Sequence, residues 1–179
     1  MKQRRIEEED LGPMKLIFNY ENVFYSFFYD DISGCIHRSR EYAMNYVYSG
    51  EMILDNGKQQ IHVGKGECVY IPRDHHITMY KRTFNGERYC GIFLNFTRNF
   101  LREMYAKFGQ CKIPADTSKL KPEVIKLPKT AEITSLFASL TPFFDPEVKP
   151  RDDFMHLKLQ EGLLALLHID GRFASTLFD

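Results

Sequence analysis

The stretch GKGECVYIPRDHH, residues 64–76, decides the fold class of this chain. A short run rich in valine, isoleucine and tyrosine lies between a glycine-rich turn at residues 63–66 and Pro72. This is the pattern of a β-strand bounded by turn residues. Similar short runs, dense in β-branched and aromatic residues, extend over residues 14–96.

The turns between these runs are as informative as the runs. The clearest hairpin is EMILDNGKQQIHV, in which Asp55, Asn56 and Gly57 tolerate positive φ between two apolar-rich arms. A further turn contains Asn85 and Gly86. Short strands at regular spacing predict a sandwich or closed barrel rather than a βαβ fold.

Helical periodicity begins after residue 95. Thr97 can cap a first helix and Gly109 can end it, whereas Thr130 can open a second helix and Pro150 a third. Three prolines between these helices predict a connector with one short strand at 124–127. The expected organisation is a charged, mobile N-terminal arm (1–13), a β-barrel with a closing helix (14–110), a connector (111–129) and a helical dimerisation tail (130–179).

The third helix is apolar on two faces. One stripe contains Phe154, Leu157, Leu164 and Leu167, and the other contains Met155, Leu159, Leu163 and Leu166. A helix of this kind must be buried from two sides. We expect the barrel to cover one side and a second copy of the chain to cover the other, with a dimer interface formed by Met155, Leu159, Gly162, Leu163 and Leu166. Complete burial within one monomer is the alternative.

Composition excludes several classes of protein. The 179 residues are 44% hydrophobic and 14% aromatic, with 24 basic and 24 acidic residues and no net charge, so a domain that clamps DNA by itself is disfavoured. The chain shows no signal peptide and no membrane span, which predicts a soluble cytoplasmic protein. Four widely spaced cysteines fit small buried side chains; they are Cys35, Cys68, Cys90 and Cys111.

The deciding stretch resembles the second sequence motif of the cupins. Gly66, Glu67 and Pro72 occupy the expected positions, and Gly50 in YVYSGEMIL resembles the close of the first motif. The resemblance implies a double-stranded β-helix, or jelly roll, which makes the chain mainly β with two or three C-terminal helices.

The metal ligands of cupins are absent from this sequence. The positions of the two histidines and the glutamate of the first motif are occupied by Ile36, Arg38 and Ala43, and the histidine of the second motif is replaced by Ile77. Isoleucine and alanine cannot coordinate a transition metal. We therefore expect no metal and no cofactor.

A metal-free cupin followed by leucine-rich helices resembles the N-terminal sensor domain of AraC-family transcription regulators. The stretches ECVYIPRDHHITMYKR and KLQEGLLALLHIDGRFASTLF carry this resemblance, which covers residues 14–178. It implies a sensing and dimerising module that is not an enzyme. A small molecule would enter the barrel, and DNA would be bound only by a helix-turn-helix half that this sequence lacks.

The resemblance and the strand alternation suggest which residues meet the effector. Alternation counted back from Gly50 points Val47 and Asn45 into the barrel, and the cupin register points Arg38 inward. Arg38 could bind a sugar acid, or could pair with a barrel carboxylate or reach solvent. Rings that could stack on a ligand, and a nearby histidine, complete the candidates: Tyr46, Tyr80, Tyr89 and His75.

Two rival functions remain open at this point. A metal-independent cupin isomerase or epimerase would need an acid–base pair, for which His75 with Tyr89 or Glu41 is the best choice. A plain carbohydrate-binding barrel is the other rival. A reading frame that continues beyond Asp179 into helix-turn-helix patterns would favour the regulator.

Overall fold

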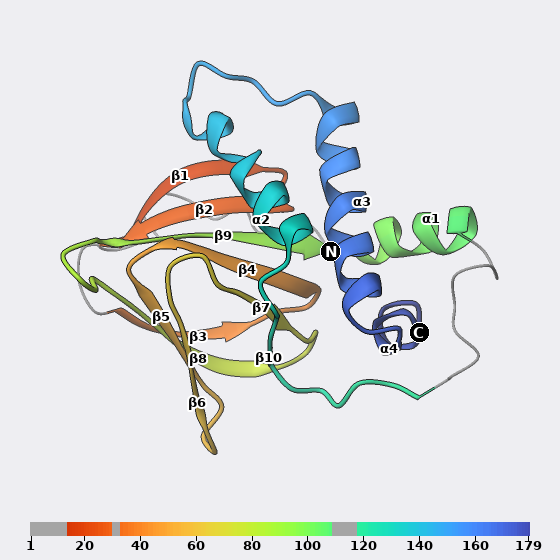
Figure 1. Cartoon of the computed structure of the whole chain (residues 1–179), viewed down its shortest axis with the longest axis horizontal. Helices are drawn as coiled ribbons and strands as arrows, with labels where there is room; N and C mark the ends of the chain where they lie inside the picture. The colour runs from red at the N-terminus through yellow and green to blue at the C-terminus, as the bar shows by residue number, and fades with distance from the viewer. Residues whose placement is uncertain (1–13, 30–32, 109–117) are drawn as a thin grey trace.

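Two antiparallel β-sheets pack face to face, and helices cover one side of the pair (Figure 1). The computed structural model describes residues 14–29, 33–108 and 118–179. The order of strands is β1-β2-β9-β4-β7-β10 in a six-stranded sheet and β3-β8-β5-β6 in a four-stranded sheet. This architecture confirms the predicted cupin-like fold. The predicted arm at 1–13, Gly109 and Cys111 lie outside the described residues.

The strands are β1 (Met14–Tyr20), β2 (Phe24–Tyr29), β3 (Ser33–Arg38), β4 (Tyr42–Ser49), β5 (Glu51–Asp55), β6 (Gln60–Val63), β7 (Cys68–Ile71), β8 (His76–Arg82), β9 (Tyr89–Phe96) and β10 (Ile125–Lys126). The helices are α1 (Arg98–Phe108), α2 (Ala131–Ala138), the 3-10 turn η3 (Thr141–Phe144), α3 (Asp152–Ile169) and α4 (Arg172–Leu177).

The six-stranded sheet is a wall shared by two hydrophobic cores. Successive side chains of a strand point to opposite faces, so Phe93 of β9 faces the space between the sheets while Leu94 packs against the helices. On the neighbouring strand β4, Val47 likewise faces the space between the sheets, and Met44 faces the helices. The first core is the barrel interior, and the second joins the sheet to α1–α4.

Predicted capping residues begin two of the helices. Thr97 Oγ1 accepts a hydrogen bond from the Phe100 backbone N–H at 3.3 Å, and Thr130 Oγ1 accepts one from Ile133 at 3.3 Å. Helix α3 begins at Asp152 with Arg151 as its N-cap, so Pro150 lies just before the helix instead of in its first turn. The predicted short strand in the connector is β10, which pairs with β7.

The helical stripe that was assigned to a dimer interface is buried inside the chain. Met155, Leu159, Leu163 and Leu166 are at most 7% exposed and belong to the core beneath the six-stranded sheet. A Cβ on Gly162 would lie 3.0 Å from Leu94 Cδ1, so this glycine allows α3 to approach the chain's own sheet. The expectation that this stripe faces a partner is therefore corrected. The exposed side of α3 carries the other stripe, with Phe154 at 54% and Leu157 at 57% exposure.

The turn between β4 and β5 requires glycine. Gly50 has φ +67°, and a Cβ there would lie 2.5 Å from Tyr89 Cα and 2.8 Å from the Arg82 carbonyl oxygen. Both of these atoms belong to the backbone, which cannot move aside easily. Gly50 therefore allows the two sheets to meet closely at this edge.

Among the described residues, Cys68 and Cys90 are buried free thiols, as predicted for small core side chains. Burial raises the pKa of the Cys90 thiol to about 11, which disfavours the reactive thiolate. No helix in the described ranges combines the length and the apolar character that a membrane crossing requires.

Candidate effector-binding site in the barrel

The core between the sheets is formed mainly by apolar and aromatic side chains. They come from seven strands and the segment before β10: Phe27, Tyr29, Ala43, Val47, Met52, Leu54, Val63, Val69, Ile71, Ile77, Met79, Tyr89, Phe93 and Val124. This lining suits the apolar body of a small molecule.

One cationic side chain enters this apolar space. Lys81 follows Ile77 and Met79 on the inward face of β8 and is only 4% exposed. Its Nζ lies 5.0 Å from the ring centroid of Tyr29 and 5.4 Å from that of Phe93. The rings of Phe27 and Tyr89 are also within 6 Å, at 5.8 and 5.7 Å. Aromatic faces attract a cation, which partly offsets the cost of burying the ammonium group.

Several buried polar atoms in the same part of the fold have no hydrogen-bond partner among the described residues. They are Oδ1 and Nδ2 of Asn45 and the Nε2 atoms of His37 and His75. Asn45 is completely buried and lies between Val69 of β7 and Phe93 of β9 in the sheet register. Buried polar groups are nearly always satisfied, and leaving one unsatisfied costs about 1–3 kcal/mol. A bound polar group would remove this cost.

His37 is neutral at ordinary pH. Desolvation by burial, and then the charge of Lys81, lower its pKa from 6.5 to about 4. Its ring stacks on Phe93 with centroids 5.3 Å apart and an interplanar angle of 20°. A neutral imidazole offers one N–H donor and one acceptor, so His37 can orient a ligand without adding charge.

The structure brings together some of the sequence candidates and separates others. Asn45 and Val47 lie in the barrel wall, as the alternation predicted, and the candidate ring of Tyr89 also faces the barrel interior. Tyr46 lies on the opposite face of the sheet, where it stacks on Phe137 of α2 with centroids 4.7 Å apart. Tyr80 alternates with the inward Met79 and Lys81, so it belongs to the outer face of β8.

The orientation predicted for Arg38 is wrong. Arg38 is exposed and its neighbour on the same face, Ile36, is 79% exposed, while His37 between them points inward. A one-residue slip in strand register sends every side chain to the other face. The cupin motif placed β3 one residue out of register, and His37 was missed for that reason.

Lys81 was also missed, although the sequence contained a signal for it. The run Ile77, Met79, Lys81 alternates on one face of β8, which indicates that the lysine points into the core. No cluster of three or more potential metal ligands occurs in the part of the chain that the structure describes.

A model of the ExsA N-terminal regulatory domain matches residues 42–176, which is most of the chain. The chain belongs to this family. It is therefore an N-terminal regulatory domain of the AraC type, which confirms the resemblance seen in the sequence. No curated protein sequence matches the chain.

Solved structures of ToxT from Vibrio cholerae share the fold of this regulatory domain. One at 1.65 Å resolution superposes with a TM-score of 0.59 at 9% identity, over 87% of this chain and 58% of ToxT. A second, bound to (E)-4-(8-methylnaphthalen-1-yl)but-3-enoic acid, gives 0.59 at 12% identity over 86% and 59%. A third, from strain SCE256 with bound unsaturated fatty acid, gives 0.58 at 8% identity over 87% and 56%. The chain thus spans less than three fifths of ToxT.

Proposed function

We propose that this regulatory domain senses a small organic acid inside the barrel and that it dimerises through α3. The binding of the acid would control DNA binding by a helix-turn-helix half outside this sequence. The protein would act in the cytoplasm. The observation that carries the effector site is Asn45, which is fully buried with both amide atoms unpartnered among the described residues. An interior that only filled the core would favour an apolar residue at this position.

The lining favours an acid over a neutral sugar. A sugar has several hydroxyl groups, each of which needs a partner when buried, and the interior is mostly apolar. Lys81 offers a positive charge and Asn45 an amide, which together suit one carboxylate on an apolar body. Both ligands named in the ToxT structures are carboxylic acids. A sugar acid, our expectation from the sequence, remains within this class.

The effector can influence the helices only if it binds two arrangements of the domain with different affinity. The shared sheet offers a physical connection, because Phe93 borders the barrel interior while the next residue, Leu94, lies under Gly162 of α3. We propose that an occupied barrel repositions β9 and, with it, α3.

The exposed stripe of α3 is the proposed dimer face. Phe154, Leu157, Glu161, Leu164 and His168 follow alternating steps of three and four residues, the spacing of a coiled-coil seam. Phe154 and Leu157 are more than half exposed. A two-fold axis would bring this stripe against the same stripe of a second copy.

A thermal-shift and calorimetric titration tests the effector. The ligands are medium-chain fatty acids, aromatic acids and sugar acids, each with its neutral alcohol or amide. We expect an acid to raise the melting temperature by mass action, its neutral counterpart to do less, and Lys81→Met to remove the difference. Equal stabilisation of both variants by neutral sugars, or no stabilisation by any acid, would reject the acid sensor.

Light scattering of the purified domain tests the dimer. Leu157→Glu should give a folded monomer, because it places a charge in the seam. Thr134→Glu, at an exposed position of α2, is the matched control and should leave the dimer intact. A dimer that persists in Leu157→Glu would rule out this face.

A further inference from the structure

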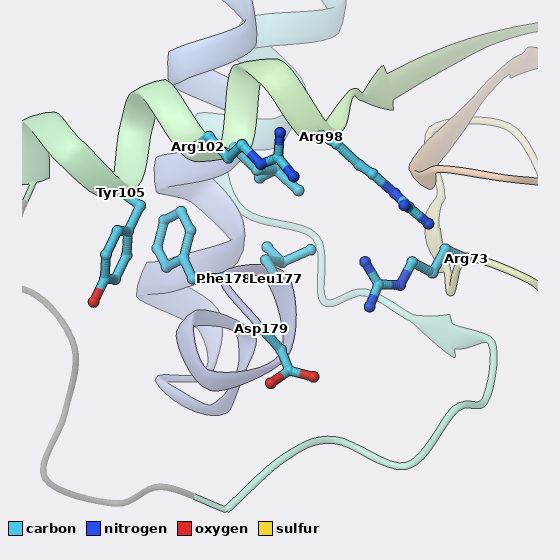
Figure 2. Close-up of a pocket in the computed structure, with 8 residues that line it drawn as sticks. Arg73, Arg98, Arg102, Tyr105, Leu177, Phe178 and Asp179 are labelled. Atoms are coloured by element: carbon cyan, nitrogen blue, oxygen red, sulfur yellow. The ribbon is translucent and has the colours of Figure 1, made fainter. Parts of the chain in front are cut away.

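A hollow lies outside the barrel, between α1, α4 and the segment that follows β7. Its volume is about 480 Å³. Figure 2 shows Arg73, Arg98 and Arg102 arranged around Leu177, with Tyr105 and Phe178 on the other side. The elements that form it are far apart in sequence, and only folding brings the three arginines together.

These three guanidinium groups make no direct ion pair with a carboxylate in the part of the chain that the structure describes. No described acidic side chain forms a salt bridge within 4.0 Å of any of them. Among the lining residues that the structure describes, the one acid is Asp179, and Lys119 already binds it with Nζ–Oδ2 at 2.8 Å. Glu41 accepts a hydrogen bond from the Arg98 backbone N–H and interacts electrostatically with the side chains of Arg98 and Arg73, as Asp179 does with Arg73, so these acids neutralise part of the positive charge. The hollow therefore has an excess of positive charge.

The arginines on α1 add positive charge to a helix end that Glu41 neutralises only in part. Arg98 and Arg102 are four residues apart on the same helical face, where like charges repel. Arg98 also lies in the first turn, at the positive end of the helix dipole, and that turn contains no acidic residue. An anion in the hollow would further reduce the repulsion between the arginines and the positive charge of this helix end.

The remaining walls of the hollow are apolar. Leu101 and Leu177 are 5% and 2% exposed, and Tyr105 and Phe178 lie together with ring centroids 5.7 Å apart. Concave shape and apolar walls fit a compact molecule better than the convex phosphate backbone of DNA. Guanidinium groups bind carboxylate and phosphate oxygens through paired hydrogen bonds.

We infer that this hollow is a second ligand site, which binds a small organic anion: a carboxylate or phosphate on an aromatic or alkyl body. Its occupant would join α1 to the end of α4, the last helix of this chain. The site is separate from the barrel, so it would give the domain a second input that does not depend on the proposed acid effector.

Isothermal titration with phenyl phosphate tests the inference on the purified domain. Phenol and inorganic phosphate supply the body and the charge separately, and phenylacetate distinguishes a carboxylate from a phosphate. We expect phenyl phosphate or phenylacetate to bind more tightly than either part. Arg98→Gln and Arg102→Gln should each weaken that binding by at least about tenfold. Arg151→Gln, at the far end of α3 and paired with Asp153, should have no effect.

Lys81→Met separates this site from the barrel. It should leave the affinity for phenyl phosphate or phenylacetate unchanged, even if it abolishes binding of an acid in the barrel. The inference is overturned if neither probe binds at millimolar concentration, or if the arginine variants bind them as well as the wild type. Arginine-dependent binding of duplex DNA, without binding of the small anions, would also overturn it.

Discussion

The neutral state of His37 makes the stability of the domain depend on pH in a defined interval. Burial and Lys81 lower the pKa of His37 from 6.5 to about 4 in the folded protein, while the unfolded chain keeps the ordinary value. Between these values the unfolded state binds more protons, so its free energy falls relative to the folded state as pH decreases. Stability is therefore complete above pH 6.5 and is lost toward pH 4.

The size of the effect follows from the width of this interval. Each unit of difference between the folded and unfolded pKa changes the free energy of unfolding by about 1.4 kcal/mol. The full interval therefore corresponds to about 3 kcal/mol, of which about 2 kcal/mol falls between pH 6.5 and 5. Carboxylates with lowered pKa values, such as Glu51 and Glu67, act mostly below this range. The pKa of Glu41 is raised by burial, which adds an opposite slope above pH 4.5.

Urea unfolding at pH 7, 6, 5.5 and 5, with wild type and His37→Gln in parallel, measures the effect. Because other groups titrate in both proteins, the quantity of interest is the difference between the two slopes. Between pH 6.5 and 5, we expect the free energy of unfolding of His37→Gln to fall by about 2 kcal/mol less than that of the wild type. His76→Gln, at the exposed start of β8, is the control and should follow the wild type. Parallel curves for wild type and His37→Gln would refute the reasoning.

Three further predictions concern packing. Gly50→Ala should lower the free energy of unfolding by about 3 kcal/mol or more, since its Cβ would overlap backbone atoms; an unchanged urea midpoint would contradict this. Leu163→Glu should prevent stable folding, because it buries an unpaired charge at a position with 0% exposure; a folded monomer by circular dichroism and light scattering would argue against the placement of α3. Tyr48→Phe should cost about 1 kcal/mol through loss of the 2.5 Å hydrogen bond to the Phe137 carbonyl oxygen, and thermal melts will show no change if that bond is unimportant.

Features that depend on neighbouring residues could be predicted from the sequence. The Asp55–Gly57 turn is one such case, since Asp55 Oδ1 accepts the Gly57 backbone N–H at 2.7 Å. The helix cap at Thr130 is another. In both, the side chain that identifies the turn or cap also makes the bond that stabilises it.

Features that depend on contacts between residues far apart in the sequence could not be predicted. Both stripes of α3 are apolar, so periodicity alone does not say which one meets the sheet. The decision depends on Gly162, whose missing side chain accommodates Leu94 of β9. The inward side of β3 is set by its pairing with β8, in which His37 lies opposite Ile77, and a motif with a one-residue offset cannot reveal it. The arginine hollow joins α1, α4 and the turn after β7, which no local pattern connects.

The alternation of β4 and β9 between two cores has a consequence for how such domains diversify. Residues such as Val47 and Phe93 shape only the chamber between the sheets, whereas Met44 and Leu94 shape only the seat of the helices. Substitutions can thus change the chemistry of the barrel interior while the packing of the helices is inherited intact. One scaffold can in this way accept different groups in its barrel without any change in how its helices pack.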